Sequence, residues 1–155
     1  KAESRGLGDV YKRQLLSMRL EKGWGVWTME YRPDFNAVES GMDVFINWKK
    51  DFVGKEATLK ALNEGVSQKL VTMVIDTDEM DVAHDEAILK DGVPVGYVSS
   101  GGYAHHVGKS MAMGYVAAEF AAAGTTLQVE ILGNFYDAEV LAGPIYDGNG
   151  VNMRS

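Results

Sequence analysis

The pattern of hydrophobic and polar positions differs between the two halves of the chain. From residue 69 onward, apolar and polar side chains alternate at the period of two that is typical of β-strands. The pattern predicts strands over residues 70–75, 88–90, 93 onward, 110–116, 127–132 and 135–141. Asp91-Gly92 predicts a type I′ hairpin turn, and Gly133-Asn134 predicts a second hairpin. Short strands at this spacing indicate a closed or nearly closed antiparallel barrel.

The first half shows shorter and more mixed patterns. Residues 15–23 are apolar and basic, which predicts a helix end stopped by Gly23. Residues 24–31 and 38–48 alternate as strands do, and residues 51–62 predict a short helix closed by Gly65. We therefore expect a mostly β, α+β chain: residues 15–66 as the end of one domain, and residues 67–155 as a small antiparallel, Greek-key-like β-barrel.

Residues 1–14 carry no hydrophobic period and are rich in polar residues and glycine. We expect them to be a disordered tail that is foreign to the protein.

Composition narrows the possible functions. The 155-residue chain has no cysteine, which excludes disulfides and cysteine nucleophiles. Its formal net charge of −7 argues against a nucleic-acid partner, because phosphate backbones require basic patches. Its sequence holds no apolar run long enough to cross a bilayer. We expect a cytoplasmic setting with neither nucleic acid nor membrane as partner.

The glycine-rich stretch 102–110 invites a phosphate-loop interpretation, but five residues separate Gly102 from Gly108-Lys-Ser, where a P-loop has four. His105 and His106 are neighbours, which face opposite sides of a strand, so we expect no metal site. Ser99, Ser100 and His105 could suggest a nucleophile, but the Gly-x-Ser-x-Gly elbow is absent.

Arg19 is the basic residue of an otherwise apolar stretch, residues 15–20. Its stem could cover the core, or its planar guanidinium could bind a carboxylate with two hydrogen bonds. Spacing alone favours the structural role and leaves the second open.

Three ordered segments carry a family resemblance. They are Met18-Arg-Leu-Glu-Lys-Gly23; Asn36-Ala-Val-Glu-Ser-Gly41 with Asp51-Phe-Val-Gly-Lys-Glu-Ala57; and Gly96-Tyr-Val-Ser-Ser-Gly-Gly-Tyr103 with Gly108-Lys-Ser and Gly114-Tyr-Val116. Together they resemble the aminomethyltransferase (glycine-cleavage T-protein) superfamily, over nearly all of residues 15–155. Within it, Gly25-Val-Trp27-Thr-Met-Glu30 and the ending, Pro144-Ile-Tyr-Asp147 with Met153-Arg-Ser155, resemble the flavin-dependent dimethylglycine and sarcosine dehydrogenases.

The resemblance implies that the chain is the C-terminal fragment of a one-carbon transfer enzyme: the end of the folate-binding central domain, followed by the family's barrel. Tetrahydrofolate would accept the N-methyl carbon of a methylated amine, which FAD in an upstream domain oxidises. The family's catalytic aspartate would lie upstream of Leu15, so we expect no catalytic residue here and an inactive fragment. Missing upstream domains would contact residues 15–48, where we expect exposed apolar surface.

Three cofactor-binding residues follow from the same resemblance. Arg19 matches the motif arginine that pairs with the folate glutamyl tail, while Tyr103 and Tyr146 are further candidates for contact with the cofactor. Gly101 and Gly102 could permit a close backbone approach or serve a bulge. Three alternatives stay open: a glycine-cleavage aminomethyltransferase, a folate-dependent sulfonium demethylase, and, in another class, a non-catalytic interaction module.

Overall fold

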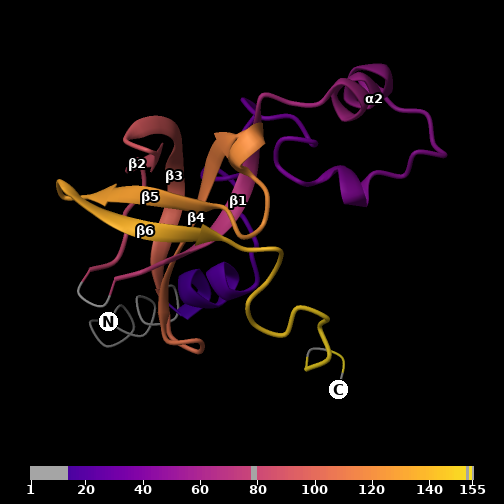
Figure 1. Ribbon diagram of the computed structural model, residues 1–155. Helices are drawn as coiled ribbons and strands as arrows, with labels where there is room; N and C mark the ends of the chain where they lie inside the picture. The colour runs from indigo at the N-terminus through magenta and orange to yellow at the C-terminus, as the bar shows by residue number, and fades with distance from the viewer. Residues whose placement is uncertain (1–13, 78–79, 153, 155) are drawn as a thin grey trace, which may run out of the picture.

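Six antiparallel strands close into a barrel in the computed structural model, which describes residues 14–77, 80–152 and 154. Figure 1 shows the barrel with its strand labels. Around the barrel the order is β1-β4-β3-β2-β5-β6, so β1 pairs with both β4 and β6. The strands are β1 (Gln68–Ile75), β2 (Ala87–Lys90), β3 (Val93–Ala104), β4 (Lys109–Ala117), β5 (Thr126–Ile131) and β6 (Asn134–Val140). The predicted mostly β fold with an antiparallel barrel is confirmed.

The barrel interior is filled by branched aliphatic side chains and methionine, donated by all six of these strands. Met73, Ile88, Val98 and Val129 are fully buried there. In β1 and β5 every second residue is buried, because successive side chains of a strand point to opposite faces. The period-two pattern of the sequence therefore reports the inner face of the barrel.

The hairpin turns follow the backbone freedom of their residues. Asp91 and Gly92 both adopt positive φ, at 52° and 78°, so the predicted type I′ turn between β2 and β3 is confirmed. The second hairpin turns one residue earlier than predicted. Leu132 and Gly133 have positive φ, and Asn134 is already the first residue of β6.

A helix at residues 14–21 packs against the barrel, in the position predicted from its apolar stretch. Gly23 ends it with φ +63°, and the Trp24 N–H donates to the Arg19 carbonyl at 2.9 Å. Leu20 is 1% exposed and joins Met111 and Met113 in a second apolar cluster on the outside of β3 and β4. Residues 1–13 of the predicted tail lie outside the described residues.

The two strands predicted at residues 24–31 and 38–48 were wrong. The first stretch is a series of turns with one isolated bridge between Trp27 and Tyr31; the second holds turns and η1 (Asp43–Phe45). The Asn36 side chain accepts hydrogen bonds from the Val38 and Glu39 N–H groups, at 2.9 Å each. The N–H groups of Val38 and Glu39 are thus bound within a local turn and cannot pair with a neighbouring strand. The alternation of side chains at residues 38–48 therefore does not report a strand.

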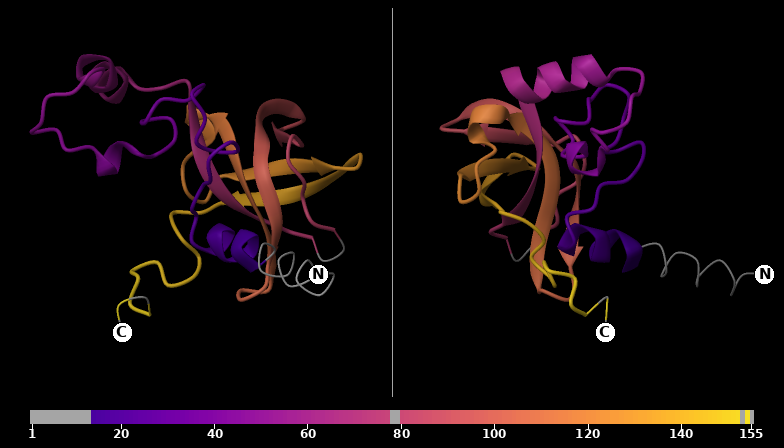
Figure 2. Two further views of the ribbon diagram at one scale, coloured as in Figure 1. Left: turned by 180° about the vertical axis from the view of Figure 1, so that it is seen from behind. Right: turned by 90° about the vertical axis from the view of Figure 1, so that its right-hand side faces the viewer.

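The predicted helix near residues 51–62 is confirmed as α2 (Lys55–Glu64), with Gly65 after its last turn. It begins late because Gly54 adopts φ +89° immediately before it. The remaining connection between β4 and β5 contains η2 (Ala118–Phe120). Figures 1 and 2 show η1 and α2 on an extension that projects to one side of the barrel. Within the described residues, the structure has no helix long and apolar enough to cross a membrane.

Candidate functional site

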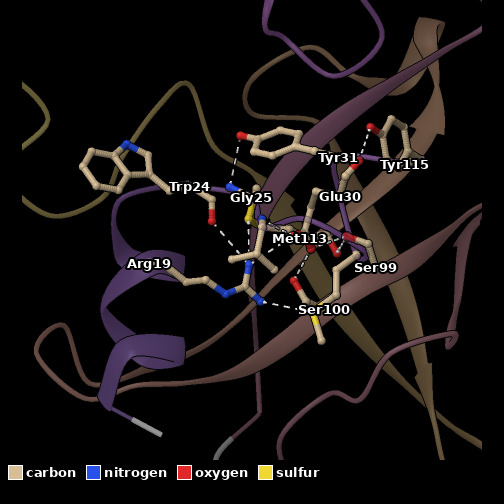
Figure 3. Close-up of polar contacts among 11 residues, drawn as sticks. Arg19, Trp24, Gly25, Glu30, Tyr31, Ser99, Ser100, Met113 and Tyr115 are labelled. Atoms are coloured by element: carbon tan, nitrogen blue, oxygen red, sulfur yellow. Dashed lines mark hydrogen bonds and ion pairs between the residues drawn. The ribbon is translucent and has the colours of Figure 1, made fainter. Parts of the chain in front are cut away.

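The helix at residues 14–21 places Arg19 against β3 and β4, where its side chain is only 5% exposed. Its Nη1 donates to Glu30 Oε2 at 3.2 Å, and the two residues form an ion pair. Figure 3 shows this pair between the helix and the barrel wall. Burial lowers the pKa of Arg19, while the charge of Glu30 acts to raise it again. The guanidinium is thus held in the protein by a buried counter-charge.

Glu30 is fully buried, and its carboxylate accepts four hydrogen bonds. Oε2 accepts from Arg19 and, at 2.8 Å, from the Val26 N–H. Oε1 accepts from the hydroxyls of Ser99, at 2.8 Å, and Ser100. A buried carboxylate is tolerated when its charge is paired and its lone pairs are used, and here both conditions hold.

A β-bulge explains how two consecutive serines reach one oxygen atom. Neighbouring side chains on a regular strand face opposite sides. The pairing of β3 with β4 shifts between Val98 and Ser100, and such an irregularity re-aims side chains. Ser99 and Ser100 therefore both donate to Glu30, and their hydroxyls make no contact with His105 among the hydrogen bonds of the described residues. Their surroundings fit structural donors rather than nucleophiles.

The loop that carries Glu30 is fixed at both ends. Tyr115 of β4 donates its hydroxyl to the Glu30 carbonyl at 2.9 Å, and the Gly25 N–H donates to the Tyr31 hydroxyl at 3.2 Å. Gly25 is required by space, because a Cβ there would lie 2.7 Å from both Glu30 Cβ and Tyr31 Cζ. Burial raises the pKa of the Tyr115 phenol, which stays a hydrogen-bond donor at neutral pH.

The guanidinium of Arg19 is anchored at one nitrogen more firmly than at the others. Besides Glu30, Nη1 donates to the Trp24 carbonyl at 3.3 Å, and the sulfur of Met113 lies 3.8 Å away. The partner of Nη2 among the described residues is the thioether of Met29, at 3.9 Å. Nε is buried and has no hydrogen-bond partner in the described part of the chain. The Nε–Nη2 edge, which suits a carboxylate with two oxygens, is therefore the less occupied one.

Arg19 also lines a surface hollow of about 420 Å³ with mostly apolar walls. Leu15, Met18, Lys22, Trp24 and Tyr146 are among its other lining residues. The C-terminal segment reaches it because the Tyr146 N–H donates to the Glu21 carbonyl at 3.2 Å, and Lys22 pairs with Asp147 at 3.1 Å. Two of the three predicted cofactor-binding residues, Arg19 and Tyr146, thus line the same hollow.

Tyr103, the third candidate, does not line that hollow. Its ring is 41% exposed and packs edge-on against His105, with the ring centroids 5.0 Å apart. The neighbouring glycine Gly101 has a packing reason, because a Cβ there would lie 2.2 Å from Val82 Cγ1. His105 and His106 lie in the turn between β3 and β4, and no metal-binding group of three residues occurs in the described chain.

A second hollow of about 420 Å³ lies at residues of β1, β4 and β6. Asp76, Asp137 and Glu139 line it together with Lys109, so its charge disfavours an anionic ligand. It contains none of the predicted site residues.

Glu30 is the functional candidate that the sequence did not reveal. A faint signal was present: one acidic residue in an aromatic stretch, eleven positions after an arginine in an apolar stretch. The serine donors, 69 and 70 positions away, come together with Glu30 only in the folded chain.

Comparison with known proteins agrees with this architecture. The fold and the site define a closed antiparallel barrel with a helix, residues 14–21, packed across its outer face. The sequence profile described as "Glycine cleavage T-protein C-terminal barrel domain" matches residues 68–147. The chain belongs to this family, and the resemblance found in its sequence is confirmed.

The relatives extend the match beyond the barrel. The chain is 34% identical to mitochondrial dimethylglycine dehydrogenase of Mus musculus over 145 residues, which cover 92% of the chain and 17% of the mouse protein. It is 31% identical to the aminomethyltransferase of Desulfitobacterium hafniense (strain DSM 10664 / DCB-2) over 136 residues, 86% of the chain and 37% of that protein. The crystal structure of glycine cleavage system aminomethyltransferase T from Bartonella henselae superposes with a TM-score of 0.79 at 25% identity. That superposition covers 86% of the chain and 38% of the Bartonella protein. The chain therefore spans well under half the length of these relatives.

Proposed function

We propose that this chain is the C-terminal part of a tetrahydrofolate-dependent one-carbon transfer enzyme, an FAD-dependent dimethylglycine or sarcosine dehydrogenase. In that enzyme, tetrahydrofolate accepts the N-methyl carbon of a methylated amine after the flavin has oxidised the amine. The identity of 34% with mouse dimethylglycine dehydrogenase, over 92% of the chain, supports this choice. The isolated chain is inactive, because its family's catalytic aspartate belongs to a part that precedes residue 15.

The observation that carries the folate assignment is the buried, unpartnered Nε of Arg19 beside an apolar hollow. A folate has a flat aminobenzoyl ring that ends in a glutamate. Trp24 and Tyr146 offer aromatic walls to the ring, and the Nε–Nη2 edge offers two donors to a carboxylate. The residues present therefore fit the glutamyl end of the cofactor. Tyr103 would serve the site only from outside the hollow.

The same proposal assigns the parts of the chain. Residues 15–66 end the folate-binding domain, and residues 67–155 form the C-terminal barrel. The preceding domains, including the flavin domain, would cover apolar side chains that are exposed here, such as Trp27, at 80%, and Phe45, at 78%. The cytoplasmic setting remains a prediction; the names of the mouse and human relatives place those proteins in mitochondria.

An aminomethyltransferase of the glycine cleavage system is the second candidate, supported by 31% identity to the Desulfitobacterium enzyme and by the Bartonella structure. Flavin absorbance of the purified full-length protein distinguishes the dehydrogenase from the aminomethyltransferase, since the dehydrogenase hypothesis requires bound FAD. A sulfonium demethylase would likewise lack flavin and would consume a sulfonium substrate.

The test is calorimetric titration of the full-length protein with tetrahydrofolate, comparing the natural sequence with Arg19→Lys. Lysine keeps a positive charge beside Glu30 but loses the planar fork. We expect the affinity to fall about tenfold, which corresponds to about 1.4 kcal/mol. Unchanged tight binding would remove Arg19 from the site and keep the family function. Absence of binding to the natural protein would favour a non-catalytic interaction module.

A further inference from the structure

The four hydrogen bonds that the Glu30 carboxylate accepts do more than compensate its buried charge. Glu30 accepts hydrogen bonds from β3, from the loop at residues 24–31 and from the helix at residues 14–21. Two serines fix Oε1 from the barrel, and the Val26 N–H fixes Oε2 from the loop. With these contacts made, the carboxylate can accept the Arg19 Nη1 hydrogen in one orientation only.

This ion pair, together with the Trp24 carbonyl, occupies Nη1 and leaves the opposite edge of the guanidinium for a ligand. Nη1 is shared between Glu30 and the Trp24 carbonyl, whereas Nε has no partner among the described residues. Nη2 is covered only by the Met29 sulfur, a weak acceptor at 3.9 Å, within the described chain. Because Nε is buried, a carboxylate reaches the Nε–Nη2 edge once the side chains over it move aside, and it then replaces that weak contact with two charge-assisted hydrogen bonds.

We propose that Glu30 is a positioning residue that fixes Arg19 so that its Nε–Nη2 edge binds the carboxylate end of the cofactor. This inference rests on the proposed folate function. It assigns Glu30 no contact with the cofactor and no part in the chemistry. Ser99 and Ser100 take part by holding Glu30, which explains why a bulge brings two consecutive hydroxyls onto one oxygen.

A competing effect makes the proposal testable. Glu30 is negative, so by charge alone its removal would strengthen the attraction of Arg19 for an anionic ligand. Positioning predicts the reverse. In Glu30→Gln, the amide nitrogen cannot accept a hydrogen bond, so at least one donor loses its partner and Arg19 loses its fixed orientation.

The experiment titrates the full-length protein with two ligands, tetrahydrofolate and tetrahydropteroate, which lacks the glutamate. The variants are Glu30→Gln and, as a matched control at an exposed position, Glu119→Gln. We expect Glu30→Gln to weaken tetrahydrofolate binding about tenfold, and to change tetrahydropteroate binding by less than about twofold. The control should change neither.

An equal loss for both ligands would show that Glu30 is merely structural, and would overturn the proposal. Unchanged or tighter tetrahydrofolate binding in Glu30→Gln would overturn it as well, while leaving the folate function in place. A natural protein that binds neither ligand would overturn the proposed function itself.

A milder variant covers the case in which Glu30→Gln does not fold. Ser100→Ala removes one donor to Oε1 and leaves the ion pair with Arg19 in place. We expect a loss of about threefold for tetrahydrofolate and none for tetrahydropteroate, since Ser100→Ala removes one of the four hydrogen bonds that hold the Glu30 carboxylate. Equal effects on the two ligands would again contradict the positioning role.

Discussion

The barrel and the segment that precedes it bury their side chains in different ways. Within the barrel, apolar residues such as Met73 and Val98 are completely buried against one another. In residues 24–54, large apolar side chains such as Trp27, Val44 and Val53 stay 80%, 75% and 104% exposed. The barrel therefore completes its own core, whereas the segment relies on a few contacts with the barrel wall.

The contacts that residues 14–54 make with the barrel include several buried charged side chains. Leu20 contributes one apolar anchor, but Arg19, Glu21 and Glu30 are also buried, at 5%, 3% and 0% exposure. Glu21 accepts from the His106 N–H at 2.7 Å, and Glu30 accepts from β3. A misplaced apolar contact costs little, but a misplaced buried charge loses both its hydration and its partners. The polar contacts thus specify one position of the segment on the barrel.

The largest expected effect comes from breaking this polar junction. Glu30→Ala leaves the Arg19 guanidinium buried without its counter-charge, which should lower the free energy of unfolding by about 3–5 kcal/mol. The double variant Arg19→Met, Glu30→Leu replaces the pair by apolar groups and should cost far less than the two single changes together. Urea denaturation of the natural sequence, Arg19→Met, Glu30→Leu and the double variant gives the coupling. Additive costs would show that the pair does not hold the segment in place.

The same contrast explains what could be predicted from the sequence. Barrel strands were predictable because the inner face of a strand repeats every second residue, and Asp91-Gly92 supports positive φ with little cost. Residues 24–31 alternate too, but Trp27 points to solvent and Glu30 to the interior. In this stretch an apolar side chain is exposed and a charged one is buried, so the alternation does not mark the inner face of a strand. The strand prediction failed there for that reason.

The site was predictable in part for the same reason. Arg19 stood out because a basic residue in an apolar stretch needs a partner. The partner could not be read from the sequence, since Glu30 is recognised as one only through the serines that a bulge in β3 brings to it. The hollow that joins Arg19 with Tyr146 depends on how the C-terminal segment crosses the helix at residues 14–21, and no local pattern encodes that crossing.

A smaller effect should follow from crowding the barrel wall. Gly114 of β4 has no room for a side chain, because a Cβ would lie 2.5 Å from the Tyr97 carbonyl oxygen and 2.8 Å from Ile88 Cδ1. Gly114→Ala should lower the free energy of unfolding by about 1–3 kcal/mol, the range for overpacked interiors. Gly143→Ala is the matched control, since its Cβ would meet no atom of the described residues within 4 Å. Equal urea midpoints for the two variants would show that the neighbouring strands shift enough to accommodate the added methyl group.

The smallest effect is expected in the exposed part of the segment. Trp27→Ser and Val53→Ser remove side chains that are 80% and 104% exposed. Surface positions without special contacts usually change the free energy of unfolding by less than about 0.5 kcal/mol, so the urea midpoints should stay close to that of the natural sequence.

Trp27→Ser can also be compared between the isolated chain and the full-length protein. The comparison separates an effect on the folding of this chain from an effect on its contact with other domains. Under the proposed function, Trp27 is covered by preceding domains of the full-length enzyme. Trp27→Ser should then destabilise the full-length protein by more than the isolated chain, by about 1–3 kcal/mol for the loss of a buried aromatic contact. Equal, small changes in both proteins would mean that Trp27 stays in solvent throughout. A large loss in the isolated chain would instead show that the segment packs on the barrel more extensively than its exposure indicates, and would remove the contrast between the two regions.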